Sequence, residues 1–330
     1  MITIVNYATA RHLAVVPGGA IVQRAGTVLV VCLAAVVVSG CTGERSSGSG
    51  GGTAGDGKVL DVVATTTQVS DFTRVIGGDQ VKVTTLIKPN VDAHDFEPSP
   101  ADIDAIAKAD LVVKNGVGLE RWLDDTIKSS GFKGPVVDAS QGVTLRQVEG
   151  EGSDPHIWQN PRNARIMVAN IERALARAEP AGAATFKANL DAYTKELTAL
   201  DAEVERQLNG LANRKLVTNH DAFGYYVDRY GLEFVGSVIP SFDTTAELSG
   251  ADIRELVAKI EQTKVKAIFS EASLPPKTAQ AIASEAGVKV VQGEDALYGD
   301  SLGPPGSDGD TYLKIVRHNT RTIVSNLSGA

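Results

Sequence analysis

Three histidines occupy turns in which an imidazole could bind a metal ion. His94 lies in the stretch VDAHDFEPSP, His156 in DPHIW, and His220 at the end of KLVTNH. A neutral imidazole held in a fixed direction suits a metal ligand. Taken alone, His94 could be a turn residue in solvent, and His156 could be a structural histidine stacked on Trp158. Their coincidence at the edges of predicted sheets, in a chain with few cysteines, favours a metal site.

The loop around His94 is expected to end at a rigid helix start. Pro89 interrupts the strand-like run VKVTTLI before the loop. Ser99 is a suitable N-cap, Pro100 suits the first helical position, and Asp102 stands three residues after the cap. His94 is therefore expected to lie a few residues from a fixed point.

From Lys58 onward, short apolar runs alternate with amphipathic ones. The expected strands are VLDVVATT, VKVTTLI, DLVVKNG, GPVVDAS, KLVTNH, LEFVGSV, VKAIFSEA and VKVVQGE. The expected helices span residues 69–76, 100–107, 119–129, 162–177, 222–230, 249–262, 275–286 and 311–327. This alternation predicts an α/β fold built from parallel βαβ units. Open sheets of this kind bind ligands at the carboxyl ends of their strands, where His220 stands.

A helix is expected over residues 181–211, longer than one small domain requires. Its apolar stripe consists of Phe186, Leu190, Tyr193, Leu197, Leu200, Val204 and Leu208. About 30 helical residues span roughly 45 Å, so this helix could join an N-terminal domain over 58–180 to a C-terminal domain over 212–330. A dimeric coiled coil is the weaker alternative, because charged residues do not occupy regular flanking positions.

The first 40 residues resemble a bacterial lipoprotein signal peptide. They contain Arg11 and Arg24 but no acidic residue, and residues 26–38 are almost wholly apolar. Val38 to Cys41 resembles a lipobox, which predicts lipidation of Cys41. An uncleaved membrane anchor is the alternative, and the long first segment leaves open a start codon further in. Residues 41–57 are rich in glycine and serine and predict a flexible tether.

Cysteine content and charge exclude several kinds of site and partner. Only Cys32 and Cys41 exist, so a signal peptide and a lipid site leave none for a disulfide or a cysteine metal cluster. Removing residues 1–40 takes two arginines away and changes the formal charge from −8 to −10. An acidic chain argues against nucleic acid as a partner. No G-x-G-x-x-G or Walker pattern follows any of the predicted strands, which gives nucleotide binding no support.

The remaining candidates are two histidines and several carboxylates. His12 belongs to the predicted signal peptide, and His318 is expected on the surface of the last helix. A long loop between Glu294 and Asp310 carries Asp295, Asp300 and Asp308. Any metal site must therefore combine histidine with carboxylate.

At this point the chain resembles the metal-binding solute-binding proteins of ABC importers, the cluster A-I or ZnuA/TroA-like family. The resemblance rests on the stretches DAHDFEPSPADI, ADLVVKNGVGLERWLD, DPHIWQNP, NHDAFGYYVDRYGL, KAIFSEASLP, DSLG and GDTYLKIVRHNT. These stretches follow the family order from about residue 58 to 330. Together they are far more specific than any one alone.

The resemblance implies two α/β domains, each with a central, mostly parallel sheet flanked by helices, joined by one long linking helix. It places a single metal in the cleft, with His94, His156, His220 and Asp300 as ligands. Asp295 and Glu271 are the nearby alternatives to Asp300. A histidine as third ligand points to Zn²⁺, whereas manganese members commonly carry glutamate there.

The same resemblance implies an extracytoplasmic lipoprotein, anchored to the cell membrane, that delivers Zn²⁺ to an ABC permease and its ATPase. We expect a monomer. The chain lacks the histidine-rich loop of many zinc members before the second ligand, which raises the Mn²⁺ alternative, and Gln159 and Asn160 depart from the usual residues. A surface adhesin is another role suggested for such proteins. A secreted zinc hydrolase is disfavoured, because four protein ligands close the metal shell and H-E-x-x-H is absent.

Overall fold

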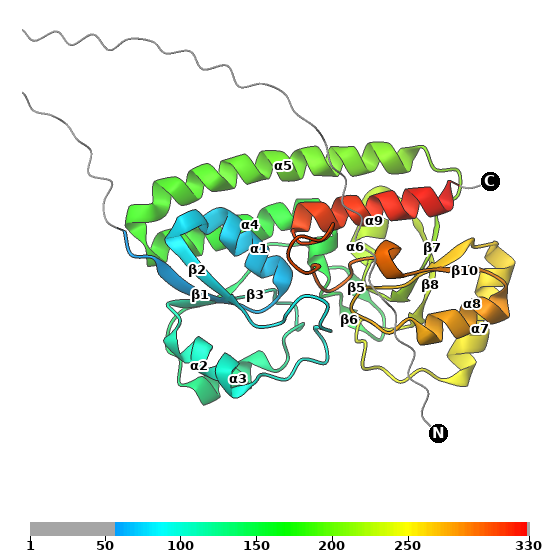
Figure 1. Cartoon of the computed structure of the whole chain (residues 1–330), viewed down its shortest axis with the longest axis horizontal. Coiled ribbons are helices and arrows are strands. Elements are labelled where there is room, and N and C mark those ends of the chain that lie inside the picture. The colour runs from blue at the N-terminus through cyan, green and yellow to red at the C-terminus, as the bar shows by residue number, and fades with distance from the viewer. Residues whose placement is uncertain (1–56, 329–330) are drawn as a thin grey trace, which may run out of the picture. The chain divides into compact units, whose positions relative to one another are not determined.

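The computed structural model describes residues 57–328 (Figure 1). The predicted signal peptide, Cys41 and all of the predicted tether except Gly57 lie outside these residues. Within the described part of the chain, none of the helices combines the length and the apolar character that a membrane crossing requires.

The first half contains a four-stranded parallel sheet in the order β2-β1-β3-β4. Its strands are β1 (Leu60–Ala64), β2 (Val81–Thr85), β3 (Leu111–Lys114) and β4 (Val136–Asp138). Helices α1 (Thr67–Gly77) and α4 (Pro161–Ala178) cover one face, where Val62 packs in one cluster with Phe72 and Val168. Helices α2 (Pro100–Lys108) and α3 (Leu123–Ser130) cover the other, where Val63 packs with Ile106. The period-two alternation of strand side chains supplies both faces.

The second half repeats this plan with a parallel sheet in the order β10-β9-β7-β8. Its strands are β7 (Lys215–His220), β8 (Glu233–Ile239), β9 (Ala267–Phe269) and β10 (Lys289–Val291). Helices α7 (Gly250–Thr263) and α8 (Lys277–Ala286) cover one face and bury Val217 and Ile268. The short helix α6 (Gly224–Tyr230) follows β7. The predicted pair of α/β sheets is confirmed.

Two helices connect the halves. The long helix α5 (Ala183–Asn209) contacts α4 and α1 in the first half and α6 in the second, and α9 (Tyr312–Leu327) packs against α5 and α1 (Figure 1). Phe72 of α1 lies 4.8 Å from the ring of Tyr312. One apolar cluster therefore runs through both halves along these helices. The domain limits at residues 180 and 212 stay a prediction.

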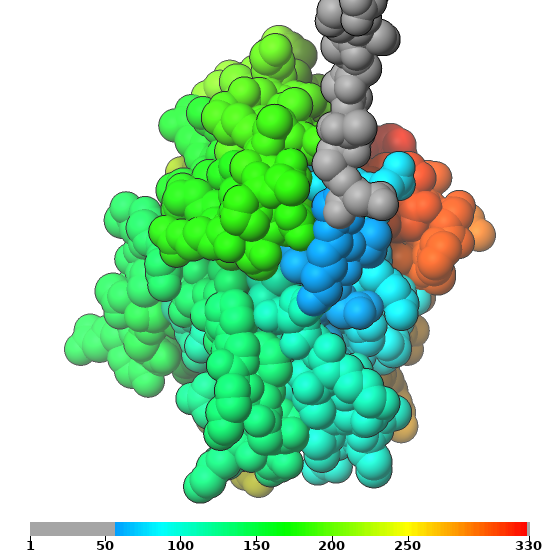
Figure 2. Space-filling view, turned by 90° about the vertical axis from the view of Figure 1, so that its left-hand side faces the viewer, coloured from blue at the N-terminus to red at the C-terminus, as the bar shows by residue number. Residues whose placement is uncertain are grey.

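Figure 2 shows the face on which the first described residues lie beside the beginning of α5. The backbone N–H of Lys58 donates to the Glu179 carboxylate, 3.1 Å away, at the end of α4. Asn189 of α5 donates to the carbonyl oxygen of Ile76 across 2.9 Å. The segment before β1 is thus bonded to the end of α4, and α1 is bonded to α5.

Three local features show where sequence patterns succeed and where they fail. The expected cap of α2 is present: Ser99 and Asp102 bond each other's backbone N–H groups as a capping box. Helix α3 begins at Leu123, later than expected, and the residues before it include a turn in which residues 116–118 have positive φ angles. The hairpin of β5 (Gln147–Val148) and β6 (Gly152–Ser153) was not predicted. It turns through Gly150, whose φ of 84° favours glycine.

Candidate metal centre

The four predicted ligands converge on one point. His94, His156, His220 and Asp300 each offer an atom within 4.8 Å of all the others, and no second group of this kind was found among residues 57–328. His94 Nε2 and His220 Nε2 both lie 3.3 Å from His156 Nε2. Asp300 Oδ2 lies 3.2 Å from both His94 Nε2 and His220 Nε2, and Asp300 Oδ1 lies 3.3 Å from His156 Nε2.

These separations suit a tetrahedral ion. Ligand atoms placed about 2.0–2.1 Å from a central Zn²⁺ are about 3.3–3.4 Å apart from each other. Asp300 Oδ1 is buried and has no hydrogen-bond partner, which leaves it free for a cation. One oxygen of Asp300 would complete an N₃O shell, and both oxygens together would give five ligand atoms.

Each ligand is positioned by the end of an element. His94 lies in the loop between β2 and α2, and His156 directly precedes a short 3₁₀ helix, Ile157–Gln159. His220 is the last residue of β7, and Asp300 lies in the loop after β10. Two ligands therefore come from each half of the chain. The side chains of His156, His220 and Asp300 are buried, and that of His94 is only 6% exposed.

Carboxylates orient two of the three imidazoles. Asp154 Oδ1 accepts from His156 Nδ1 at 2.8 Å and from its backbone N–H at 3.0 Å. Glu271 Oε1 accepts in the same way from His220 Nδ1 at 2.7 Å and from its backbone N–H at 3.1 Å. A proton on Nδ1 leaves the Nε2 lone pair directed at the centre, as in carboxylate–histidine–metal triads.

Protons compete with a metal ion for the side chains of this centre. Burial lowers the pKa of His220, but the Glu271 and Asp300 carboxylates outweigh burial and raise that pKa well above its usual value. Burial raises the pKa of Asp300, but His220 and His156 outweigh it and hold the carboxyl well below its usual range. A metal ion must therefore displace a proton from His220, so binding weakens as pH falls.

The His94 loop is attached to the second half of the chain. The backbone N–H of Asn90 donates to Ser301 Oγ at 2.8 Å, one residue after Asp300. Asp92 accepts from the backbone N–H of His94 at 2.9 Å and from Thr244 Oγ1 at 2.7 Å. The first and last ligands are thus held together by hydrogen bonds of their own loops.

The alternatives to Asp300 lie elsewhere. Asp295 is exposed on a short 3₁₀ helix, and Glu271 contacts the far side of His220.

The expectation that His318 lies on the surface is wrong. His318 is buried, its Nε2 lies 2.9 Å from the carbonyl oxygen of Ala296, and burial lowers its pKa. It falls three residues after Ile315 on the apolar stripe of α9, a spacing that the sequence contained.

Sequence reasoning did not identify the supporting roles of Asp154 and Glu271, and it considered Glu271 only as an alternative ligand. Asp154 stands two residues before His156, a spacing that could have indicated it, whereas Glu271 is 51 residues from His220 and has no local signal. Gln159 donates from Nε2 to the carbonyl oxygen of Gly299 at 3.1 Å, next to Asp300. Asn160 caps α4 by accepting from the backbone N–H of Arg162.

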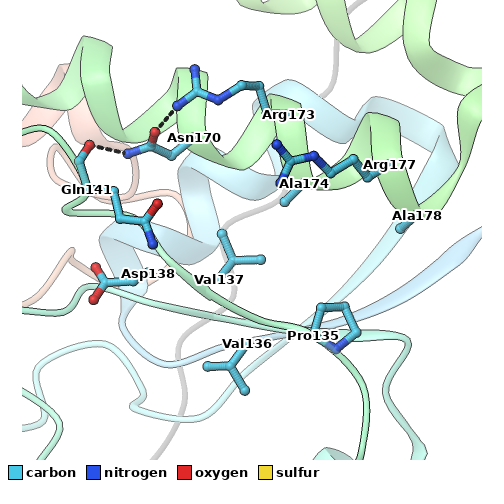
Figure 3. A pocket seen from close by; sticks show the side chains of 10 residues that line it. All are labelled: Pro135, Val136, Val137, Asp138, Gln141, Asn170, Arg173, Ala174, Arg177 and Ala178. Carbon is cyan, nitrogen blue, oxygen red and sulfur yellow. Dashed lines mark hydrogen bonds between the residues drawn. The ribbon is translucent and has the colours of Figure 1, made fainter.

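A separate cavity of about 300 Å³ lies between the edge strand β4 and α4 (Figure 3). The exposed side chains of Arg173 and Arg177 line it from α4, and Arg173 is held by Asn170. It contains none of the four converging residues.

Comparison with known proteins agrees with this geometry. Residues 62–326 match the family described as ZnuA, zinc-uptake complex component A, periplasmic. The chain belongs to this family. The members of the ZnuA family are metal-binding components of ABC importers and not enzymes.

Relatives within the ZnuA family differ in the metal that they are named for. The chain is 32% identical to the zinc-binding protein TroA of Treponema pallidum, over 90% of this chain and 98% of that protein. It is 31% identical to the manganese-binding lipoprotein MntA of Bacillus subtilis, over 92% of this chain and 100% of that protein. The solved structure of the Treponema pallidum periplasmic zinc-binding protein TroA superposes with a TM-score of 0.77 at 30% identity, covering 82% of this chain and 99% of that one.

Proposed function

We propose that this chain captures one Zn²⁺ ion with His94, His156, His220 and Asp300 and delivers it to an ABC permease driven by its ATPase. The observation that carries the proposal is the set of four separations of 3.2–3.3 Å among the three Nε2 atoms and Asp300 Oδ2, which suit a tetrahedral N₃O shell. Zinc is the substrate here, not a resident cofactor. The two ligands from each half make the ion a bridge between them.

Zinc is favoured over manganese by the three imidazoles. Nitrogen ligands suit Zn²⁺, whereas Mn²⁺ prefers carboxylate and water oxygen. Manganese is the second candidate, supported by the two oxygens of Asp300 that face the histidines and by the similarity to MntA, which is named for manganese.

The proposal includes an extracytoplasmic body tethered to the membrane by lipid on Cys41. Curated relatives named as lipoproteins support this part. In cells, Cys41→Ala should abolish lipid labelling and release the protein from the membrane fraction. Unchanged labelling would contradict the anchor.

Metal analysis tests the centre itself. Protein purified without added metal and titrated with Zn²⁺ and Mn²⁺ should bind one ion per chain, with a preference for zinc. A free ligand at about 1,000 times its Kd adds about 4 kcal/mol of stability, so zinc should raise the Tm by several degrees and chelator should reverse the shift. A melting curve indifferent to zinc and chelator at neutral pH would contradict the proposal.

A further inference from the structure

Glu271 has a fixed position behind two of the four converging residues. The chain leaves β9 and pairs with the segment before Asp300: Leu297 N–H donates to the Ser270 carbonyl at 2.8 Å, and Ala272 N–H donates to the Leu297 carbonyl at 2.9 Å. Glu271 lies between these two bonds and forms a parallel bridge with Leu297. Its side chain is fully buried.

The two oxygens of Glu271 have different surroundings. Oε1 accepts both hydrogen bonds from His220 described above. Oε2 is buried and has no hydrogen-bond partner. A Cβ atom at Gly299 would lie 1.8 Å from Oε2, so the residue before Asp300 passes directly over this oxygen. Glu271 therefore contacts His220 and the backbone that carries Asp300.

Asp154, the matching carboxylate behind His156, is compensated differently. Its Oδ1 accepts from His156, while its Oδ2 pairs with the Arg146 guanidinium at 3.2 Å. Among residues 57–328, the ion pairs of Glu271 include no lysine or arginine, and its partner is His220 alone. The carboxylate of Asp154 is thus paired with a guanidinium as well as with His156, whereas the carboxylate of Glu271 is paired with His220 alone.

A buried carboxylate with one free oxygen is unfavourable unless positive charge is nearby. A divalent cation on His220 Nε2 would supply that charge through the imidazole ring, and the carboxylate would in turn make the imidazole a stronger donor. We infer that Glu271 is a positioning residue that sets the metal affinity of the centre, by fixing the His220 tautomer and by supplying charge that no basic side chain offsets. This inference rests on the proposed metal-binding function.

The test compares Zn²⁺ affinity by competition with a chromogenic chelator in wild type, Glu271→Gln, Asp154→Asn and His220→Ala. Glu271→Gln keeps the volume and an acceptor for Nδ1–H but removes the charge. We expect it to weaken zinc binding by about 10–100-fold. Asp154→Asn should weaken binding less, because Arg146 already shares the charge of Asp154.

A stability measurement separates this role from a merely structural one. The metal-free Glu271→Gln protein should melt within about 3 °C of metal-free wild type, which corresponds to about 1 kcal/mol. Nitrogen NMR of the zinc-loaded protein should show protonated Nδ1 at His220 in wild type. The matched control is Glu120→Gln: Glu120 is also a buried glutamate, bonded to Thr65 and to backbone N–H groups, but it contacts no ligand. Its substitution should leave zinc affinity unchanged.

The outcomes are distinguishable. Unchanged affinity in Glu271→Gln, together with weakened binding in His220→Ala, would overturn the role of Glu271 and leave the centre intact. A large loss of metal-free stability that accounts for the lost affinity would also overturn it. Unchanged binding in His220→Ala would instead contradict the proposed function.

Discussion

The indole Nε1–H of Trp158 donates to the backbone carbonyl of Gly299 across 3.0 Å. Trp158 follows the ligand His156 by two residues, and Gly299 precedes the ligand Asp300. The Trp158 carbonyl in turn accepts from the Tyr312 hydroxyl at 2.6 Å. A direct hydrogen bond therefore connects the segments that carry His156 and Asp300, independently of any bound ion.

Removing this bond should weaken metal binding without unfolding the protein. Trp158→Phe keeps an aromatic ring but loses the donor, while Gln159 still satisfies the Gly299 carbonyl. One hydrogen bond contributes about 0.5–1.5 kcal/mol, so we expect zinc affinity to fall about 2–10-fold in a competitive titration. The matched control is Trp122→Phe, because the buried Nε1 of Trp122 has no hydrogen-bond partner. Equal zinc affinities for all three proteins would show that the Trp158 bond does not position Asp300.

The fold and the three converging histidines were accessible from the sequence because their signals are local. Apolar runs predict strands such as Lys215–His220, and a histidine at the end of a strand lies at the sheet edge where ligands bind. The capping box of α2 predicts the end of the His94 loop in the same way. The assignment of Asp300 over Asp295 came from family resemblance alone.

The supporting contacts were inaccessible because they depend on the path of the folded chain. Glu271 follows β9 and reaches His220 at the end of the neighbouring strand β7, 51 residues away in the sequence, and Gln159 reaches Gly299 across 140 residues. Sequence spacing carries no information on such pairs. The two-residue strands of the β5–β6 hairpin are likewise too short for a periodic pattern.

Substitution of His220 tests the choice of metal. His220→Ala should reduce zinc affinity by more than the roughly 10–100-fold typical of a lost supporting residue, because a ligand is removed. His220→Glu should weaken zinc binding more than manganese binding, since a carboxylate suits the harder ion. Titration of both ions into each variant measures the ratio.

The neighbouring carboxylate sharpens this prediction. A glutamate at position 220 would face Glu271, whose Oε1 now lies 2.7 Å from His220 Nδ1, and two buried like charges repel. The double variant His220→Glu with Glu271→Gln should therefore bind manganese more tightly than His220→Glu alone. If the zinc-to-manganese preference stays at the wild-type value in both variants, the third histidine does not determine selectivity.

We expect Asp71 to make the stability of the protein depend on pH, independently of metal binding. Burial raises its pKa from 3.8 to about 6, against the opposing effects of the Tyr312 backbone N–H and Arg74. Between about pH 4 and 6 the folded protein holds a proton that the unfolded chain has lost. This contribution to stability is therefore present below about pH 4 and is lost as pH rises through 6.

Asp71→Asn should remove the loss of stability that occurs as pH rises, because the amide carries no charge. Its oxygen can still accept from the Tyr312 N–H, which lies 2.9 Å from Asp71 Oδ2. We expect the free energy of unfolding to rise by up to about 3 kcal/mol at pH 7.5, with a gain that shrinks towards pH 5. Urea unfolding of both proteins at pH 7.5, 6.5 and 5.5, with chelator present, measures the difference. A gain that is the same at every pH would contradict the titration of Asp71.

Asp201 on α5 joins helices from both halves. It accepts from Arg162 of α4 at 3.0 Å, from Arg229 of α6 at 2.7 and 2.8 Å, and from the Tyr230 hydroxyl at 3.1 Å. Burial raises the pKa of Asp201, but the hydrogen bonds from the two guanidinium groups outweigh it and hold the pKa below its usual value. A depressed pKa means that this contribution is present above the unfolded pKa and is lost as pH falls.

Asp201→Ala should lower the free energy of unfolding by about 2 kcal/mol at pH 7.5, because it leaves two guanidinium groups and a hydroxyl without their acceptor. The control is Asp191→Ala on the same helix. Asp191 pairs with Lys187 one turn away, with both side chains more than half exposed, and such pairs contribute about 0.3–0.5 kcal/mol. Urea unfolding of the metal-free proteins should separate the two variants by more than 1 kcal/mol. Equal losses would mean that Asp201 is no more than a surface charge, and that the apolar stripe of α5 alone holds the two halves to the helix.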